Sequence, residues 1–289
     1  MPSISTLCVL VTCFNRKDKT LDCLRYLAES AGQCSIQMRG VLVDDGSSDG
    51  TAEAIQAAFP WMVVLRGVGN LYWNRGMHMA MAHGMRHLPS DAYLWLNDDT
   101  NLDPHALVVL LETADTLAAR YGRSGLVVGS TRDPITGELT YGGSVGVSKL
   151  RRFSYRKVFD PQQAVPCQAI NGNVVLIPAA VAADVGNLDP VFEHAMGDTD
   201  YGLRALRRHW PVVVAPGFVG TCSKNPLAGS FQDPALGRAA RWRHIISRKG
   251  LPIRSWAHLC RRHGGWQWPV LFVWPYLRVL LSSAPRGPR

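Results

Sequence analysis

The first 130 residues alternate short apolar, β-branched runs with segments whose apolar side chains recur at helical spacing. Residues 7–13 read LCVLVTC, and residues 17–30 then place Leu21, Leu24 and Leu27 along one helix face. Strands that alternate with helices form a parallel sheet covered on both faces, and such sheets bind ligands at the carboxyl ends of their strands. The sequence therefore predicts an α/β fold with a doubly wound, mostly parallel sheet. The further predicted strands are 39–43, 62–65, 92–96 and 126–129, and the further helices are 51–59, 74–87 and 104–120.

Beyond Ser130 the pattern changes. Residues 131–146 read TRDPITGELTYGGSVG, and their turn residues predict hairpins before residues 164–177 return to the sheet. We expect a helix over 198–209, a strand over 212–215 and an irregular loop over 216–237. Together these segments predict one domain over residues 1–237, with halves at about 1–130 and 131–237.

The last 52 residues differ from this domain in charge. Residues 238–289 hold 11 Lys or Arg and no Asp or Glu, whereas residues 1–237 hold 20 basic and 22 acidic residues. Five of the nine Trp residues also lie in this C-terminal part. Because the excess of basic over acidic residues is confined to this end and no RNA-binding motif accompanies it, we expect no nucleic-acid partner. We expect instead a basic, Trp-rich helical tail over 238–289.

The distribution of apolar residues also predicts where in the cell the protein resides. No apolar run reaches 18 residues, and residues 1–11 lack a basic segment followed by a long apolar one, so we expect a cytoplasmic protein. Residues 268–281, WPVLFVWPYLRVLL, are too short to span a bilayer, but Trp, Leu and Arg suit a helix on an anionic surface. Two interpretations stay open: peripheral binding to the inner face of the cytoplasmic membrane, or packing of the Trp residues on the domain or in a homodimer.

Several common sites are excluded by missing motifs. No G-x-G-x-x-G follows the first strand, and no G-x-x-x-x-G-K-[ST] occurs, which argues against a dinucleotide dehydrogenase and a P-loop. The seven cysteines include no CxxC pair, so we expect reduced thiols in the core.

Adjacent carboxylates end the second and fourth predicted strands. Asp44 and Asp45 in VLVDDGSSDGT suit an acceptor for a pyrimidine imino group, although Asp, Gly and Ser also dominate simple turns. In YLWLNDDT, Asp98 and Asp99 end a buried strand, where oxygen ligands suit Mg²⁺ or Mn²⁺. The alternative for Asp99 is a cap on the helix that begins near Pro104.

A third acidic pair opens a later helix. Asp198 and Asp200 in HAMGDTDYGLRALRRHW stand at a helix N-terminus, where the dipole stabilises negative charge. A general base would have the same pattern, so the two interpretations remain open from these residues alone.

Six short segments occur in one order over about residues 7–225: TCFNR (12–16), VDDGSSDGT (43–51), GNLYWNRGMHMAM (69–81), LNDDT (96–100), INGNVVLIP (170–178) and GDTDYGLR (197–204). In order and spacing they resemble the inverting glycosyltransferases of family 2, which have the GT-A fold. The first two segments match the family's first-strand loop and base-binding acid. The others match its donor loop, metal motif, acceptor-side glycine segment and catalytic acid motif.

The resemblance implies a role for each matching position. Asp198 would be the base that deprotonates an acceptor hydroxyl, and Asp99, with Asn97 in place of the motif's first acid, would hold Mg²⁺ or Mn²⁺. Donor-nucleotide contacts would come from Thr12, Arg16, Asp44, Asp45, Asn70, Asn74 and Asp98, and acceptor-side contacts from Gly172, Asn173 and Asp200. The chain departs from the family twice: Gly197 stands where the motif has Glu, and PGFVGTCS (216–223) lacks the His of some relatives.

The resemblance further implies the activity. We expect transfer of a sugar, with inversion, from a UDP or dTDP donor to a hydroxyl of a glycan or lipid-linked glycan. The subset with GNLYW and LNDDT resembles bacterial transferases of surface polysaccharide synthesis, including those that use dTDP-rhamnose. The alternative is a non-catalytic homologue that binds a nucleotide or glycan. The presence of both Asp99 and Asp198 argues against that alternative.

Overall fold

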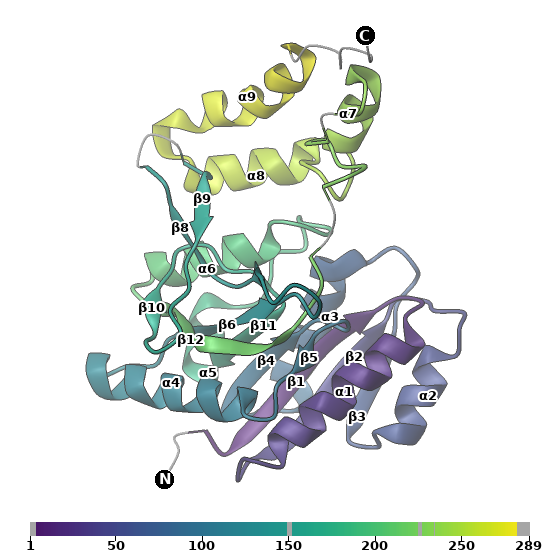
Figure 1. Ribbon diagram of the computed structural model, residues 1–289, viewed down its shortest axis with the longest axis vertical. Coiled ribbons are helices and arrows are strands. Elements are labelled where there is room, and N and C mark those ends of the chain that lie inside the picture. Colours follow the sequence, from purple (N-terminus) through teal and green to yellow (C-terminus); the bar gives the residue numbers. More distant parts are fainter. Residues whose placement is uncertain (1–3, 149–151, 225–226, 234, 282–289) are drawn as a thin grey trace.

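The computed structural model describes residues 4–148, 152–224, 227–233 and 235–281. Its centre is a ten-stranded sheet in the order β10-β12-β6-β11-β4-β1-β2-β3, with β5 and β7 paired to β12 and β6 (Figure 1). β1 (Thr6–Cys13), β2 (Gln37–Asp44), β3 (Met62–Arg66) and β4 (Ala92–Leu96) are parallel. β6 (Leu126–Arg132) and β12 (Val212–Thr221) form a second parallel pair. The predicted α/β, mostly parallel sheet is thus confirmed.

The strand order reverses at β1, which lies between β2 and β4. β11 (Val174–Pro178) is antiparallel to both β4 and β6 and joins the two parallel groups. The shorter strands complete the edges: β5 (Asn101–Leu102), β7 (Leu139–Tyr141) and β10 (Val165–Pro166), with β8 (Ser144–Gly146) and β9 (Tyr155–Lys157) as a separate two-stranded ribbon. A reversal of this kind opens a crevice at the carboxyl ends of the strands.

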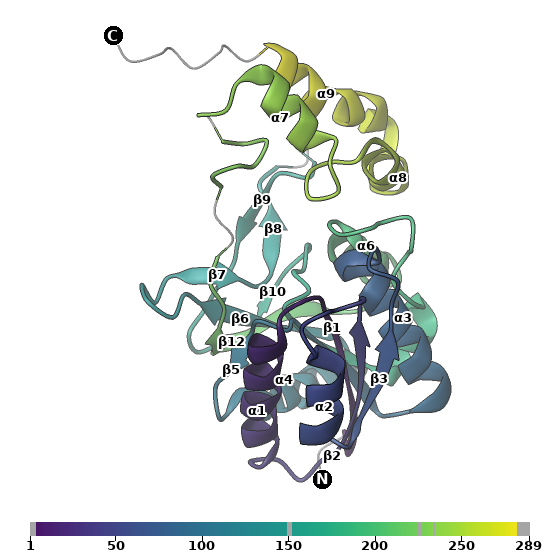
Figure 2. The same cartoon turned by 90° about the vertical axis from the view of Figure 1, so that its right-hand side faces the viewer.

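Helices cover both faces of the sheet because its buried strands are apolar on both sides. In β1, Leu7 and Val9 pack into one hydrophobic cluster and Cys8 and Leu10 into another. α1 (Lys17–Ala31), α2 (Thr51–Ala58) and α4 (Ala106–Tyr121) belong to the first cluster, and α3 (Tyr72–His87), α5 (Ala179–Val185) and α6 (Gly197–Arg207) to the second. Figure 2 shows α1 and α3 on opposite sides of the sheet.

The prediction of an irregular loop over residues 216–237 is wrong for its first six residues. Residues 216–221 were expected to be irregular, but they continue β12 as far as Thr221. The pairing of β12 with β6 shifts register between Val214 and Phe218 and again before Gly220. Pro216 and Gly217 lie within the first shift, so turn-forming residues here mark an irregularity within a strand rather than its end.

The described part of the C-terminal region is helical, as expected. α7 (Arg238–Ile245), α8 (Ile253–His263) and α9 (Trp268–Leu281) form a layer at the end of the molecule away from the N-terminus (Figures 1 and 2), hereafter the C-terminal layer. Their shared cluster includes Trp256, Leu259 and Tyr276 and extends to Phe192. Residues 282–289 of the predicted tail lie outside the described residues, and the domain boundary at 237 stays a prediction. Among the described residues, every helix is too short or too polar to cross a membrane.

Candidate active site

The carboxyl ends of β1 and β2 bring the first predicted donor residues together. Asp44 is 1% exposed; its Oδ1 accepts a hydrogen bond from Ser47 N at 2.9 Å, while its Oδ2 is buried without a partner among the described residues. Buried carboxylate oxygens are normally paired, so Asp44 Oδ2 is an acceptor ready for a donor group. Thr12 is also buried, against Gly76 of α3.

The carboxylate of Asp45 makes different contacts from that of Asp44. Its carboxylate accepts hydrogen bonds from the backbone N–H groups of Gly69, Leu71 and Tyr72 at 2.9, 2.8 and 3.1 Å. It therefore fixes the loop before α3, in which Asn70 is exposed. The predicted contact of Asp45 with a nucleotide would have to be indirect, through this loop.

The side chains after β4 form a second group with Arg16. Nη1 of Arg16 lies 3.1 Å from Asp98 Oδ1 and 2.9 Å from Asp99 Oδ2. Burial raises the pKa of Asp98 to about 6, against the opposing charge of Arg16. α4 begins at Ala106, without a side-chain cap, so Asp99 does not cap that helix.

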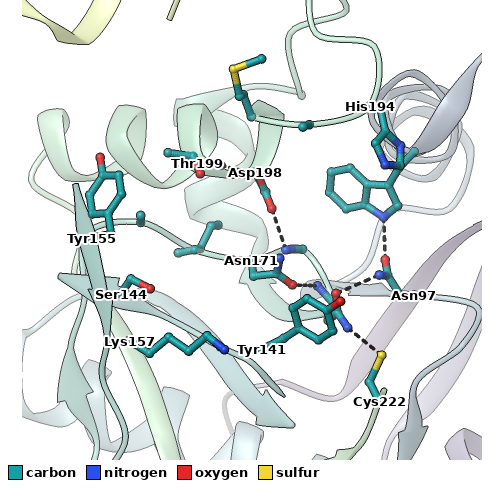
Figure 3. Close-up of a pocket in the computed structure, with 18 of the residues that line it drawn as sticks. Asn97, Tyr141, Ser144, Tyr155, Lys157, Asn171, His194, Asp198, Thr199 and Cys222 are labelled. Carbon is teal, nitrogen blue, oxygen red and sulfur yellow. Dashed lines mark hydrogen bonds between the residues drawn. The ribbon is translucent and has the colours of Figure 1, made fainter. Parts of the chain in front are cut away.

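Asn97 is fixed by neighbours on both sides. Its Oδ1 accepts a hydrogen bond from Trp73 Nε1 at 2.6 Å, and its Nδ2 donates to Asn173 Oδ1 at 2.8 Å (Figure 3). Gly172, next to Asn173, lies so close to Trp73 that an added Cβ would be 2.2 Å from the indole ring. The indole therefore packs on the Gly172 backbone and holds Asn97 in place.

The donor set for a divalent ion is small. Asp99 is one of the two carboxylates, with Asp198, that line the cavity described below, and the described residues hold no group of three or more His, Cys, Asp or Glu positioned to bind a metal. Mg²⁺ and Mn²⁺ sites often use one or two protein carboxylates together with substrate phosphates and water. Asp99 with Asp98 beside it fits that kind of site, in which Arg16 gives up or shares its contact with Asp99.

Asp198 stands in the first turn of α6, where Met196 provides the cap position in a left-handed conformation. Its Oδ1 accepts from Thr199 N at 2.7 Å and its Oδ2 from Gly172 N at 3.0 Å. Burial raises the pKa of Asp198 above its ordinary value, although these backbone hydrogen bonds oppose the shift. A carboxylate with a raised pKa is a better proton acceptor than an exposed one.

A cavity of about 440 Å³ unites Asp198 with Asp99, Asn97, Gly172 and Asn173. In Figure 3, Asp198 and Thr199 enter from α6, while Ser144, Tyr155 and Lys157 come from the β8–β9 ribbon across the cavity. The sequence argument missed several side chains that line it: Trp73, Tyr141, Tyr155, Lys157, Asn171, His194, Thr199 and Cys222. Five of them lie within the segments considered above for their acids or family motifs: Trp73, Asn171, His194, Thr199 and Cys222.

His194 is the least expected member of the lining. Its Nδ1 is buried without a partner among the described residues, and its ring meets Tyr72 edge-on at 6.2 Å. Burial lowers the pKa of His194, helped by the charges of Lys249 and Arg16. A neutral imidazole with a free ring nitrogen can accept or donate one hydrogen bond to a polar ligand.

Eight predicted site residues are not among those that line this cavity: Thr12, Arg16, Asp44, Asp45, Asn70, Asn74, Asp98 and Asp200. Asn74 and Asp200, two of these eight, have side chains that are engaged within the protein. Asn74 is buried, and its Nδ2 donates to the carbonyls of Asp189 and Phe192 at 2.9 and 2.8 Å, so it ties α3 to the loop before α6. Asp200 is also fully buried, and its carboxylate is engaged by Arg204, Arg262 and His263. Both were expected to contact substrates; the side chains of both are instead used inside the protein.

The two departures from the family pattern have structural counterparts. A Cβ on Gly197 would lie 1.6 Å from Asn74 Oδ1, so the position has no room for a Glu side chain. In the segment without His, Cys222 places its Sγ 3.6 Å from Asp99 Oδ1 and accepts from Asn173 Nδ2 at 3.2 Å. Cys222 is therefore part of the site, whereas the sequence argument placed all seven thiols in the core.

Solved structures of glycosyltransferases share the fold. The mannosyltransferase PcManGT from Pyrobaculum calidifontis, in complex with GDP-Man and Mn²⁺, superposes with a TM-score of 0.56 at 13% identity over 95% of this chain and 72% of that one. S. aureus TarS in complex with UDP gives 0.53 at 12% identity over 89% and 70%. At these identities the likeness establishes the GT-A fold alone.

Relatives of known name are also transferases. N-acetylglucosaminyl-diphospho-decaprenol L-rhamnosyltransferase of Mycobacterium tuberculosis is 24% identical over 275 residues, which is 86% of this chain and 83% of that protein. Undecaprenyl-phosphate 4-deoxy-4-formamido-L-arabinose transferase of Edwardsiella ictaluri is 30% identical over 115 residues, so this chain spans about a third (35%) of that protein's length. The family model described as Glycosyl transferase family 2 matches residues 8–165, more than half of the chain. The chain belongs to glycosyl transferase family 2.

Proposed function

We propose that this glycosyltransferase inverts the anomeric centre of a nucleotide-activated sugar as it transfers the sugar to a hydroxyl of a lipid-linked glycan. The observation that carries the proposal is that Asp198 and Asp99 line one cavity from opposite elements, α6 and the end of β4. A base on one side of a sugar and a diphosphate-binding group on the other suit a single displacement. Inversion follows from one displacement.

Asp198 is the proposed base. Each of its oxygens accepts one backbone hydrogen bond, which fixes the carboxylate and leaves lone pairs free toward the cavity. As the acceptor oxygen attacks the anomeric carbon, its proton passes to Asp198 and the bond to the nucleoside diphosphate breaks. His194 and Lys157 line the same cavity and would hydrogen-bond the acceptor.

The donor nucleotide is proposed to bind at the ends of β1 and β2. Asp44 Oδ2 would accept the imino N–H of a uracil or thymine ring in a UDP or dTDP donor. Arg16, whose Nη1 lies 2.9 Å from Asp99 Oδ2, would pair with the diphosphate. Mg²⁺ or Mn²⁺ held by Asp99 would neutralise charge on the leaving group when bound.

The acceptor class rests on the relatives. The Mycobacterium tuberculosis protein that matches most of the chain is named for a rhamnosyl transfer to a diphospho-decaprenol lipid. A rhamnosyl donor and a polyprenyl diphosphate acceptor are therefore the first pair to test, in the cytoplasm where nucleotide sugars are made. A role in surface polysaccharide synthesis follows from that acceptor.

A thermal-shift titration with UDP, dTDP and GDP, each with and without Mn²⁺, tests the donor site. A ligand that binds only the folded state at a hundredfold excess over Kd adds about 2.7 kcal/mol of stability. We expect a metal-dependent rise in Tm with UDP or dTDP, and its loss in Asp99→Ala. The matched control is Asp103→Ala, which removes a nearby carboxylate that pairs with Arg132 and should keep the metal response.

The same titration separates the second candidate function. A non-catalytic homologue that binds a glycan through this cavity would show no nucleotide or metal response, whereas one that binds a nucleotide would show the shift but no turnover of a sugar donor. An absence of any shift with the three nucleotides would therefore favour the glycan-binding protein and contradict the transferase.

A further inference from the structure

α9 is apolar on both of its faces. One face packs inward, where Tyr276 and Val279 are buried against α8 together with the partly buried Trp268, Leu271 and Phe272. The opposite face is open, with side chains 42–85% exposed. We call it the α9 outer face, with the preceding turn included: Trp266, Val270, Val273, Trp274, Leu277, Leu280 and Leu281.

The six positions within α9 follow the helical period, so they form one stripe rather than scattered exposures, and Trp266 lies in the turn just before it. A helix that is apolar all round is normally buried, and a contiguous exposed apolar stripe marks an interaction surface. With 14 residues, α9 is too short to cross a bilayer. Trp266 and Trp274 carry amphipathic rings that favour the boundary between water and lipid.

The positive charge of the C-terminal layer indicates what kind of surface the α9 outer face would bind. Residues 238–281 contain nine Lys or Arg and no Asp or Glu. Arg254 and Arg261 are exposed on α8, and Arg278 is exposed on α9 next to Leu277 of the stripe. A stripe of Trp, Leu and Val flanked by cations and lacking acids complements anionic lipid, whereas two copies of the same cationic surface would repel each other.

We propose that the α9 outer face binds an anionic membrane surface, with the helix lying in the plane of the lipid headgroups. Figures 1 and 2 show α9 at the outer edge of the C-terminal layer, with α8 between it and the rest of the molecule. The inference extends the proposed function, because it brings the enzyme to the surface where a lipid-linked acceptor resides. Membrane binding itself does not depend on that chemistry.

α8 connects this surface to the helix that carries Asp198. Nη1 of Arg262 lies 3.0 Å from both oxygens of Asp200, and His263 Nε2 donates to Asp200 Oδ1 at 2.8 Å. Arg262 also pairs with Asp189 at 2.6 Å. The C-terminal layer is therefore anchored to α6 through buried charge, so a membrane under α9 would hold the cavity in a fixed orientation.

The test is flotation of the full chain with vesicles of phosphatidylcholine alone or with about one third phosphatidylglycerol. We expect binding to the anionic vesicles at least about tenfold stronger than to neutral ones, weakened by salt. Val270→Glu/Trp274→Glu should weaken that binding by at least about tenfold, because each Glu adds a negative charge to a surface that must contact anionic lipid. The matched control is Val68→Glu/Ile135→Glu, at positions 78% and 91% exposed and outside the C-terminal layer, which should change binding less than about twofold.

Wild-type protein provides a readout that needs no variant. Lipids brominated in their acyl chains should quench Trp fluorescence in anionic vesicles and leave it unchanged in neutral ones. Equal binding to both vesicles, no binding to either, or a dimer in light scattering that Val270→Glu/Trp274→Glu converts to a monomer would overturn the proposal. The nucleotide thermal shift is measured on the same samples. A variant that loses vesicle binding but keeps the shift leaves the proposed function intact.

Discussion

The sheet edge and the C-terminal layer place their charged groups in opposite ways. At the sheet edge, buried strands end in Asp44, Asp98 and Asp99, and the topology alone brings these acids around one crevice. In the C-terminal layer, cations surround an apolar helix face, and its buried pairings use acids from other elements, Asp189 and Asp200. The first region gathers acids from its own strand ends; the second is completed by contacts outside itself.

The largest expected effect is on catalysis at the sheet edge. Asp198→Asn keeps the size of the side chain but removes the proton acceptor, so kcat should fall by at least about 10²-fold, the lower range for a general base. Nucleotide binding by thermal shift should persist. Asp184→Asn, an exposed carboxylate on α5 paired with Arg208, is the control that should leave the rate unchanged. A variant with near wild-type turnover would remove Asp198 from the mechanism.

Asp200→Asn tests the contact between α6 and the C-terminal layer. It leaves Arg204 and Arg262 beside a buried neutral group, and breaking a buried pair costs about 3–5 kcal/mol. We expect that loss in urea unfolding, because the anchor of α8 to α6 is weakened. Asp184→Asn serves again as the exposed comparison and should change stability by less than about 0.5 kcal/mol. A similar small change for Asp200→Asn would mean that the C-terminal layer is held by its apolar contacts alone.

Asp198 and Asp200 should respond to pH with opposite signs. Burial raises the pKa of Asp198, so its ionised form opposes folding above its unfolded pKa of about 3.9, and the rate should rise with pH as it loses its proton. Burial also acts on Asp200, but the hydrogen bond from His263 and the charges of Arg204 and Arg262 lower its pKa. Asp200 therefore stabilises the protein above pH of about 4, and that contribution is lost as pH falls through its lower folded pKa.

Urea unfolding of wild type and both Asn variants between pH 3 and 8, with kcat/KM measured over the stable range, checks these signs. Asp198→Asn should match or exceed wild-type stability at neutral pH, while Asp200→Asn should show its deficit there and approach wild type in acid. The remaining kcat/KM of Asp198→Asn should not show the fall at low pH that wild type shows. The reverse order of stabilities at pH 7 would contradict the assignment.

The smallest expected effect concerns the contact between α3 and α6. Gly197→Ala places a Cβ against Asn74 Oδ1, and overpacking of this kind costs about 1–3 kcal/mol. Asn74→Ala removes the obstructing atom but also two buried hydrogen bonds. In a double-mutant cycle, the pair should be less destabilised than the sum of the single variants. Additivity would show that Gly197 is not constrained by Asn74.

The sequence by itself determined the order of strands and helices, because apolar alternation and helical spacing are local properties that tertiary contacts reinforce here. It also determined that acids follow β2 and β4, since a residue after a strand must lie at the sheet edge. The family is confirmed by the match over residues 8–165, while the roles of Asp44, Asp99 and Asp198 stay predictions.

Only the tertiary structure decided which polar residues face the cavity. Asn74 and Asp200 lie in the same motifs as Trp73 and Asp198, yet their side chains turn to the loop at 189–192 and to α8. Tyr155 and Lys157 reach the cavity from β9, which is distant in sequence from α6 and from the end of β4, and no spacing rule relates these elements. Whether a polar side chain meets solvent or protein depends on what packs over it, and that neighbour is set by long-range contacts rather than by local sequence.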